Sequence, residues 1–324
     1  MAGNVWVLAE HWRGQLSEAT FELLVLGREL ATGTGGQLQA VLLGHQAGSL
    51  AGELGAADTV LRVDHPSLAE PSAEAYGRAL AALVGARAPQ VLLIPLTNVS
   101  SDLIGLLAAR LGAPLVNFCS DIQAAGDAFE ARCLLYGGKM ETTVAVAAAP
   151  AVVGVLPGAR AGAAARGGAA PAVEDVAVDL DGELRVRFER YIEPPAGDVD
   201  STQQAVLVSV GRGIQTKDNI ALAEELAAAL GGAVSASRPV IDQGWLPMTR
   251  QVGKSGATVK PKLYLAAGIS GAPEHVEGMK NAELIIAVNT DPQAPIFSVA
   301  HYGIIGETVE ILPALTEAVK ARKG

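Results

Sequence analysis

Residues 262–275 read KLYLAAGISGAPEH, an apolar run followed by a glycine-containing turn and then by Pro273, which suits the first turn of a helix. An apolar run of this length, bounded by glycine, is typical of a buried strand. Backbone amides at the start of the following helix point outward, where they favour an anion. The stretch therefore predicts a strand–turn–helix unit whose turn is suited to a negatively charged ligand.

The same order repeats around this unit, over the last third of the chain. Apolar runs and turn residues predict strands at Val206–Val210, Lys262–Ala266 and Leu284–Val288, a helix from Thr216 to Leu230, extended pieces at 303–306 and 309–311, and a helix over Leu312–Arg322. We expect Thr216 to cap the first helix and Pro313 to stand in the first turn of the last. Strands that alternate with helices indicate a doubly wound parallel sheet.

The first half of the chain shows the same alternation and then loses it. The pattern predicts strands at Asn4–Ala9, Gln37–Leu43, Thr59–Val63 and Val91–Pro95, and helices over Leu16–Thr32, Ser72–Arg87 and from Ser101 or Asp102 to Leu111. From Pro114 onward, strands follow one another with few helices, at Val116–Ile122, Phe129–Tyr136, Glu141–Ala147, Val152–Val155 and Glu183–Ile192, with a mobile loop at Gly158–Pro171. We therefore predict a nucleotide-binding-like α/β domain with extra strands.

Domain boundaries follow from length and from one proline-rich stretch. A chain of 324 residues exceeds one typical core, so two domains are expected. Pro194-Pro195-Ala196-Gly197 and the polar residues that follow are typical of a linker. We predict an α/β domain over residues 1–197, a linker at 198–204 and a doubly wound parallel-sheet domain over 205–324.

Composition narrows the possible functions. Half of the residues are apolar and only 4% are aromatic, which suits close packing of helices on a sheet. The formal net charge of −10 disfavours nucleic acid as a partner. Cys119 and Cys133 form no Cys-x-x-Cys motif, and no apolar run reaches membrane-spanning length. We expect a cytoplasmic protein with reduced thiols that is not inserted into a membrane.

Each candidate ligand-binding turn has a purely structural alternative. Gly211-Arg212-Gly213 follows a strand, but Thr216 stands where a G-x-G-x-x-G motif needs glycine, so a tight strand-to-helix turn is equally consistent. Gly253-Lys254-Ser255 lacks the preceding spacing of a Walker loop, and a surface turn explains it as well. His275 alone is an ordinary surface residue. Asn289 ends a buried strand, where open α/β sheets place ligand contacts.

Taken in order, these motifs resemble the FAD-binding domain of the electron transfer flavoprotein alpha subunit. The resemblance rests on Ser237-Arg238, Gln251–Gly256, Gly268–His275 and Asn289–Pro292, together with Asp291–Phe297 and Ala300–Gly303. It extends over nearly the whole chain and is dense from Val206 onward. It implies that FAD is bound by Arg212, Ser237, Arg238, Val252, Gly253, Lys254, Ser255, Ser270, Gly271, Ala272, Pro273, Glu274, His275, Asn289, Glu307 and Thr308.

The resemblance also implies where several of these residues lie. It places Arg212 at the nucleotide part of the cofactor, and Glu307 and Thr308 at the adenosine end. It places the loop Val252–Ser255 against the flavin ring, with the Ser255 hydroxyl near flavin N5. The family commonly has threonine in place of Ser255 and aspartate in place of Glu307.

Two further residues are implied to set the charge around the flavin. The resemblance places Arg238 against the isoalloxazine ring and His275 near the flavin C2 carbonyl. A guanidinium keeps its proton at working pH, so Arg238 is expected to favour the reduced cofactor. His275 is expected to reinforce this positive charge.

The N-terminal domain carries no comparable set of motifs. Thr97–Asp102 stands at a strand end before a helix, where a nucleotide would fit the fold. The family often has Gly-Arg-Asp where this chain has Ser100-Ser101-Asp102, and we interpret the segment as a helix cap.

The implied function is that of an electron carrier, not an enzyme. The chain would pair with a beta subunit and pass electrons between flavin dehydrogenases and a membrane-associated quinone reductase or another acceptor. The absence of an evident acid–base pair or metal cluster fits a carrier whose cofactor performs the chemistry. An electron-bifurcating complex is the first alternative, because Trp245–Arg250 resembles that type.

Two alternatives come from other classes of protein. A thiamine-pyrophosphate-type enzyme shares the β/α pattern, but the chain lacks a Gly-Asp-Gly metal motif. A nucleotide-binding stress or scaffold protein is supported by the N-terminal half alone.

Overall fold

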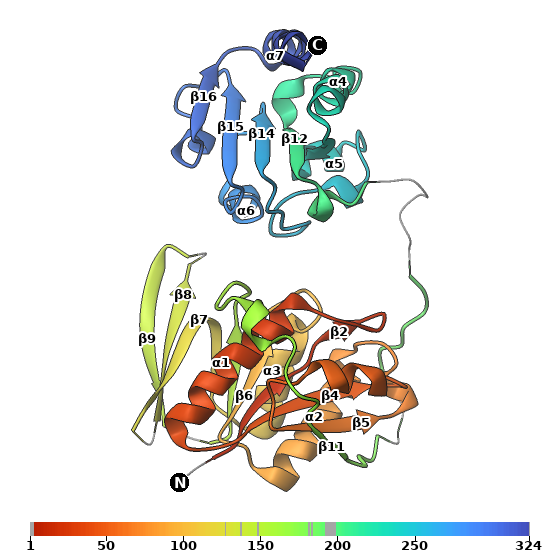
Figure 1. The fold of residues 1–324 in the computed structure, drawn as a ribbon, viewed down its shortest axis with the longest axis vertical. Coiled ribbons are helices and arrows are strands. Elements are labelled where there is room, and N and C mark those ends of the chain that lie inside the picture. Colours follow the sequence, from red (N-terminus) through yellow and green to blue (C-terminus); the bar gives the residue numbers. More distant parts are fainter. Residues whose placement is uncertain are drawn as a thin grey trace. The chain divides into compact units, whose positions relative to one another are not determined.

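The computed structural model describes residues 3–126, 128–136, 138–147, 149–180, 182, 184–191 and 199–323. The chain divides into two compact units, Met1–Arg190 and Tyr191–Gly324, and each has its own sheet and cores (Figure 1). The expected two-domain α/β fold is thus confirmed. The proline-rich stretch at 194–198 lies outside the described residues, and 199–204 contain a short 3₁₀ helix, η4 (Ser201–Gln203).

The N-terminal unit is built on a nine-stranded sheet of order β11-β5-β4-β1-β6-β10-β7-β8-β9. The strands are β1 (Val5–Leu8), β4 (Leu38–Gly44), β5 (Thr59–Asp64), β6 (Val91–Pro95), β7 (Leu115–Ala125), β8 (Ala128–Leu135), β9 (Met140–Val146), β10 (Ala151–Val155) and β11 (Ala172–Asp175). Strands β7, β8 and β9 pair antiparallel, and the other pairs are parallel. The loss of alternation after Pro114 therefore corresponds to an antiparallel extension of a parallel sheet.

Helices and short connections complete this unit. They are α1 (Glu18–Thr34), α2 (Ala73–Arg87), α3 (Ser101–Leu111), the 3₁₀ helices η1 (Gly48–Glu53), η2 (Pro66–Leu68) and η3 (Gly162–Ala165), and a small hairpin of β2 (His11–Trp12) and β3 (Gln15–Leu16). The Ser17 and Ser72 side chains accept hydrogen bonds from the first-turn amides of α1 and α2, which fixes where each helix begins.

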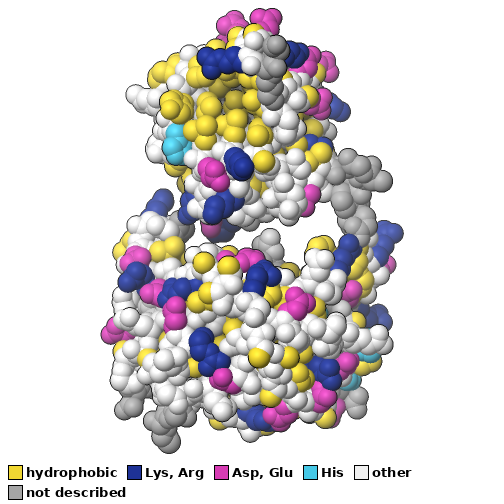
Figure 2. All heavy atoms as spheres, viewed as in Figure 1, with side chains coloured by type: hydrophobic (Ala, Val, Ile, Leu, Met, Phe, Trp, Pro, Cys, Tyr) yellow, Lys and Arg dark blue, Asp and Glu magenta, His cyan; other side chains and the backbone are white. Residues whose placement is uncertain are grey.

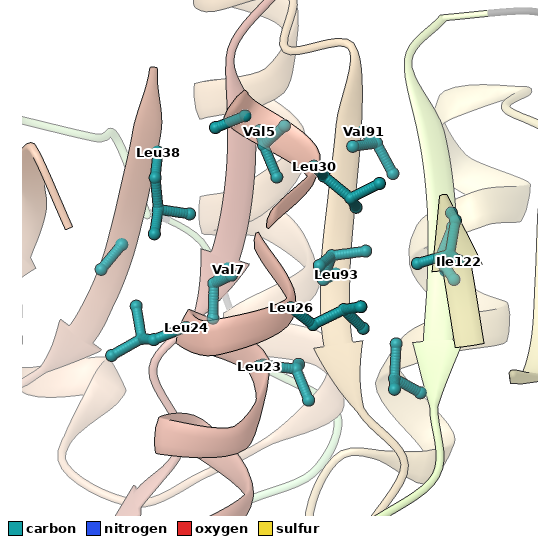
Figure 3. Packing of buried hydrophobic residues seen from close by; sticks show 14 of the residues in the cluster. Val5, Val7, Leu23, Leu24, Leu26, Leu30, Leu38, Val91, Leu93 and Ile122 are labelled. Atoms are coloured by element: carbon teal, nitrogen blue, oxygen red, sulfur yellow. The ribbon is translucent and has the colours of Figure 1, made fainter. Parts of the chain in front are cut away.

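Alternating residues of the central strands face two apolar clusters. Val5 and Val7 of β1 pack with Leu24 of α1 (Figure 3), whereas Trp6 and Leu8 face α2 and α3. Both faces of these strands are buried, as expected for a parallel sheet covered by helices. This explains why their sequences are continuous apolar runs.

One expected strand of the N-terminal unit was wrong. The segment expected as a strand at Glu183–Ile192 contains no strand in its described part, residues 184–191. The edge strand is β11, just after the Gly158–Pro171 segment. That segment contains η3, which contacts α1. Alternation at 183–192 was misleading because local pattern does not show whether a sheet edge is available for pairing.

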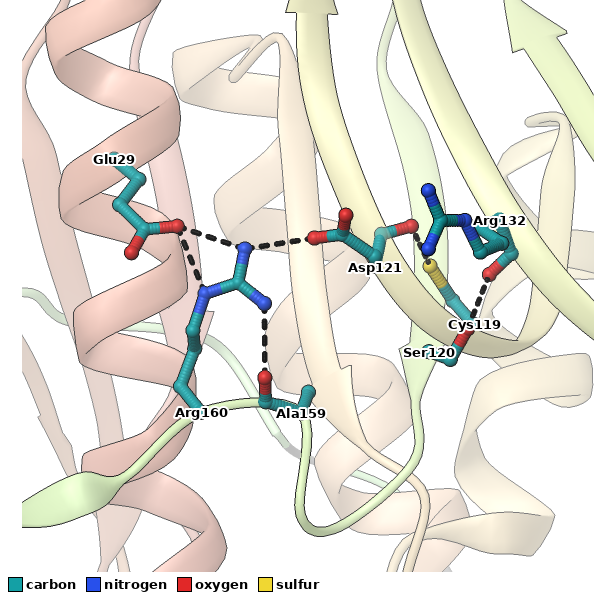
Figure 4. A network of polar contacts seen from close by, with 7 residues as sticks. All are labelled: Glu29, Cys119, Ser120, Asp121, Arg132, Ala159 and Arg160. Atoms are coloured by element: carbon teal, nitrogen blue, oxygen red, sulfur yellow. Dashed lines mark hydrogen bonds and ion pairs between the residues drawn. The ribbon is translucent and has the colours of Figure 1, made fainter.

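Arg160 joins this segment to the sheet extension. Its guanidinium donates to Glu29 of α1 at 2.9 Å and to Asp121 of β7 at 2.7 Å (Figure 4). A third nitrogen donates to the carbonyl of Ala159 at 2.8 Å. Because Arg160 is only partly exposed, this network helps to fix β7 against α1.

The C-terminal unit is a five-stranded parallel sheet of order β13-β12-β14-β15-β16. Its strands are β12 (Val206–Val210), β13 (Ala233–Ala236), β14 (Leu263–Ala267), β15 (Leu284–Asn289) and β16 (Tyr302–Ile305). Its helices are α4 (Ile220–Leu230), α5 (Arg238–Asp242), α6 (Pro273–Glu277), α7 (Thr308–Lys323) and the 3₁₀ helices η5 (Arg212–Ile214), η6 (Met248–Arg250) and η7 (Pro295–Ser298). The predicted doubly wound fold is confirmed.

Three details of the C-terminal helices differ from expectation. Helix α4 begins after Asn219, so Thr216 does not cap it. Helix α7 begins at Thr308, so residues 309–311 are helical and Pro313 lies inside the helix, beyond its first turn. The extended conformation expected for residues 309–311 was wrong because a short segment with apolar residues at both ends does not distinguish a strand from a helix.

The C-terminal sheet also separates two apolar clusters. Leu207 and Tyr264 face one cluster, and Val208 and Leu265 face the other, with α4 and α7. Figure 2 shows hydrophobic side chains gathered on the face of this unit turned to the viewer. Among the residues of its edge strand β16, Tyr302 and Ile305 are exposed. No helix in the described part of the chain is long and apolar enough to cross a membrane.

Candidate cofactor site

All sixteen residues predicted to hold the cofactor lie in the C-terminal unit. Because its strands are parallel, their carboxyl ends share one edge, and the loops that follow them meet there. Arg212 follows β12, Ser237 and Arg238 follow β13, and Asn289 ends β15. The segment Ser270–His275 follows β14, and Glu307 and Thr308 follow β16 at the start of α7. The Val252–Ser255 loop is held near the end of β13 by a bridge between Gln251 and Ala236.

Glycines press two of these loops together, backbone against backbone. A Cβ on Gly211 would lie 2.2 Å from the Gly268 carbonyl oxygen, and one on Gly213 would lie 2.6 Å from the Gly268 Cα. The Gly213 amide donates to the Gly268 carbonyl at 3.0 Å. The glycines beside Arg212 therefore serve contact between the β12 and β14 loops, which supports the structural interpretation of this turn. Arg212, which lies between them, is exposed.

The loop that contains Val252 is joined to helix α6. The Lys254 amide donates to the Glu274 carbonyl at 2.7 Å. Gly253 has a positive φ of 139°, and a Cβ on it would lie 3.0 Å from the Glu274 carbonyl oxygen. Gln251 is buried and donates from Nε2 to the Ser255 hydroxyl at 2.9 Å. Because Ser255 accepts this bond, its own proton remains able to donate to a ligand.

The loop after β14 is also held from beneath. Gly271 has a φ of 86°, and a Cβ there would lie 2.3 Å from the backbone nitrogen of Ile296. The Ile296 amide donates to the Ser270 carbonyl at 3.0 Å. Asn289 donates to the Ile269 carbonyl and accepts from the Asp291 amide. Asn289 thus ties neighbouring loops together. The next residues, Ala272, Pro273 and Glu274, are exposed where α6 begins.

Three of the predicted residues are exposed cations. They are Arg212, Arg238 and Lys254. Arg238 lies 3.5 Å from Asp242, one turn along α5, and its side chain is 67% exposed. Ser237 precedes it as a buried residue without a capping hydrogen bond. After β16, Glu307 accepts a hydrogen bond from Gln215 at 3.1 Å, and Thr308 is buried.

His275 is buried, in contrast to the surface position that its sequence context indicated. Its Nε2 lies 2.9 Å from the Tyr264 hydroxyl, and its Nδ1 forms no hydrogen bond of ordinary geometry with the described residues. Burial lowers the pKa of His275 to about 4, and the backbone of Val252 opposes that shift. The ring is therefore uncharged near neutral pH and does not add to the charge of Arg238 as expected.

The N-terminal unit offers a different environment at its own carboxyl edge. A crevice there is lined by Glu10, His11, Val99 and Ser100. Burial raises the pKa of Glu10, although hydroxyls including that of Thr97 donate to it. A buried carboxyl group disfavours a phosphate. The cap was expected at Ser101 or Asp102, but α3 begins at Ser101 and Ser100 occupies the cap position. The Ser100 hydroxyl donates to the Pro95 carbonyl and makes no capping bond.

Three residues that contact predicted site residues were not themselves predicted. Gln251 and Gln215 support Ser255 and Glu307, and Tyr264 supports His275. Gln251 belongs to the Gln251–Gly256 motif, so the sequence already indicated that it lies near the site. Tyr264 gave none, because an aromatic residue in an apolar strand is usually only part of the core. The described residues contain no group of His, Cys, Asp and Glu suited to a metal ion.

Two family models match the chain, one for each unit. Residues 5–181 match the electron transfer flavoprotein domain, and residues 200–280 match the electron transfer flavoprotein FAD-binding domain. The chain belongs to the electron transfer flavoprotein family. It is of the alpha-subunit type, its cofactor is FAD, and it is a redox carrier. Alpha subunits of this family pair with beta subunits.

Curated relatives match over nearly the full length. The chain is 37% identical to the acryloyl-CoA reductase electron transfer subunit beta of Anaerotignum propionicum, over 99% of this chain and 96% of that protein. It is 36% identical to protein FixB of Azotobacter vinelandii, over 99% of this chain and 92% of that protein. It is also 36% identical to the electron transfer flavoprotein subunit alpha of Clostridium acetobutylicum, over 98% and 97%.

Proposed function

We propose that one FAD binds at the carboxyl edge of the β12–β16 sheet and that the sixteen residues named above form its site. The observation that carries this proposal is the convergence of exposed cations and hydroxyls on one edge of a parallel sheet. Arg212, Arg238 and Lys254 offset the charge of a cofactor that bears two phosphates. Once bound, FAD supplies the electron-transfer chemistry, and the chain supplies binding and electrostatics.

The residues present fit this cofactor. The Ser255 hydroxyl retains a proton to donate, as a flavin ring nitrogen requires. Helix α7 spans 16 residues and directs its amino end toward the loops of the same edge. By contrast, Glu10 makes the N-terminal crevice a poor site for a phosphate. These observations favour the C-terminal unit over the stress- or scaffold-protein alternative, which rested on the N-terminal half.

Arg238→Ala is expected to lower the midpoint potential of bound FAD while most of the FAD stays bound. The fixed positive charge favours the reduced cofactor, but exposure and the nearby Asp242 weaken it. We expect a change of about 1 kcal/mol, or roughly 40 mV for one electron. A reductive titration followed by absorbance measures it, with Arg238→Lys as the charge-retaining control. Equal potentials in the alanine and lysine variants would contradict this role.

We also propose that the beta subunit covers the exposed end of one face of the β8–β9 hairpin, the face whose other end packs into the core of the N-terminal unit. Along β8, Ala131, Cys133 and Leu135 point to one face, and the exposed fraction rises from 0% and 2% to 39%. Their neighbours on β9 include Val144, opposite Ala131, and Met140, opposite Leu135; both are exposed. An apolar sheet face that emerges from its own core in this way is suited to a partner protein.

Leu135→Glu is expected to weaken the heterodimer at least tenfold. The substitution places a carboxylate on the proposed contact face without removing a core residue. Val186→Glu is the matched control, because Val186 is an exposed apolar residue elsewhere on the same unit. Sedimentation of each variant with the beta subunit gives the dissociation constants. Equal weakening by both substitutions would place the interface elsewhere.

The finer role is proposed as that of a carrier between flavin dehydrogenases and a membrane-associated quinone reductase or another acceptor. The bifurcating alternative rests on the Trp245–Arg250 segment. A flavin count on the purified heterodimer separates the two: one FAD supports the carrier, and two support the bifurcating complex. Two buried free cysteines, Cys119 and Cys133, support a cytoplasmic location.

A further inference from the structure

A row of buried hydroxyls lies beneath the candidate site, on one face of the C-terminal sheet. Ser209 of β12 stands directly opposite Ser235 of β13, and both are fully buried. Leu207, two residues before Ser209, is paired with Tyr264 of β14, so all three hydroxyl-bearing side chains point to the same face. Such groups are costly to bury unless they interact with one another.

The three hydroxyls and His275 Nε2 have few other partners, which limits how their protons can be arranged. Neither serine hydroxyl forms a hydrogen bond of ordinary geometry with the described residues, but both lie on the same buried face as the Tyr264 ring. Burial raises the pKa of Tyr264, and the two serines oppose that rise, as donors to its oxygen would. The phenol has one proton, and if the serines donate to its oxygen, that proton is left for His275 Nε2, 2.9 Å away.

We propose that Ser209, Ser235 and Tyr264 form a buried relay that holds His275 as the neutral tautomer with its proton on Nδ1. Tyr264 is then a positioning residue for the cofactor site. Since Nε2 accepts from the phenol, the ring proton must be on Nδ1. The ring centroids lie 6.1 Å apart and the ring planes are tilted by 54°, so the two side chains meet through the hydroxyl and not by stacking.

The relay reaches the loop that we assign to the flavin ring. The backbone of Val252 acts on the His275 ring, the Lys254 amide bonds to the Glu274 carbonyl, and Gly253 packs against the His275 Cα. His275 therefore sits where helix α6 meets the Val252–Ser255 loop. A single tautomer fixes which polar atom faces this loop and so holds the loop ready for the cofactor. This consequence rests on the FAD site proposed above, whereas the tautomer does not.

The tautomer is measured on the cofactor-free chain by ¹⁵N NMR of its histidine rings, with His275→Gln identifying the signal. We expect protonated Nδ1 and unprotonated Nε2 at pH 7. Protonated Nε2, or a doubly protonated ring, would overturn the relay. This readout needs no substitution in the relay itself, so misfolding of a variant does not affect it.

Tyr264→Phe then tests the consequence for the site. It removes the hydroxyl and retains the ring, and Tyr302→Phe on β16 is the exposed control. We expect faster amide exchange at residues 252–255 and about tenfold weaker FAD binding for Tyr264→Phe only. Unchanged exchange and affinity would overturn the positioning role. If the unaltered protein bound no FAD while the tautomer was as expected, the proposed FAD site would fail and the relay would stand.

Discussion

Gly271→Ala is expected to destabilise the C-terminal unit by about 3 kcal/mol and to abolish FAD binding. The backbone of Gly271 has a φ of 86°, which L-residues rarely adopt. A Cβ at this position would also lie 2.3 Å from the Ile296 nitrogen and 2.6 Å from its Cα. Because that clash is with backbone, the loop after β14 must move away from η7. Ser270 and the start of α6 would move with it.

Gly244→Ala isolates the steric part of this effect. Gly244 also has a positive φ, of 66°, but a Cβ there meets nothing within 4 Å. Its substitution is expected to cost only the left-handed strain, about 1 kcal/mol, and to leave FAD bound. Amide exchange of β14 and FAD titration measure both variants. Similar losses in the two proteins would show that the Gly271–Ile296 contact does not shape the site.

The C-terminal unit is expected to lose about 3 kcal/mol of stability as the pH falls from 6.5 to 4. Burial lowers the pKa of His275 to about 4, below its ordinary value of 6.5. In this interval the unfolded chain binds a proton that the folded chain does not, so unfolding becomes easier with acid. Above pH 6.5 both states are neutral at this residue, and the contribution is fully present.

Histidine variants separate this effect from general acid denaturation. His275→Gln is expected to remove most of the pH dependence of β14 amide exchange, after correction for intrinsic rates. His301→Gln is the matched control in the same unit; its Nδ1 accepts from the Ile285 amide, and its ring is exposed. An unchanged pH profile in His275→Gln would show that buried His275 does not govern acid stability.

The fold was largely predictable because its strands are buried on both faces. Apolar runs such as Val206–Val210 and Val91–Pro95 are bounded by glycine or polar residues, and both form strands at those bounds. Antiparallel β7–β9 was also visible as a change of pattern after Pro114. The wrong strand assignment arose because a local sequence pattern does not show which strand a segment pairs with. Residues 184–191 alternate like a strand, whereas Ala172–Asp175 pairs with β5.

The site was predictable in its chain positions but not in its internal contacts. The chain positions were predictable because the motifs follow parallel strands, whose carboxyl ends share one edge of the sheet. Burial explains the second: His275 was expected to be charged, yet it lies beneath the surface against Tyr264. The role of Tyr264 depends on which face of β14 it occupies and on two serines from other strands. Side-chain partnerships of this kind follow from register, which no single segment encodes.

The central claim is that FAD occupies the carboxyl edge of the C-terminal sheet. Amide hydrogen exchange of the heterodimer, with and without FAD, tests it most directly because it maps protection along the whole chain. We expect FAD to protect residues 211–213, 252–256, 268–275, 289–291 and 306–308, with little change around Glu10 and Ser100. Protection centred on the N-terminal crevice, with none at the five C-terminal segments, would contradict it.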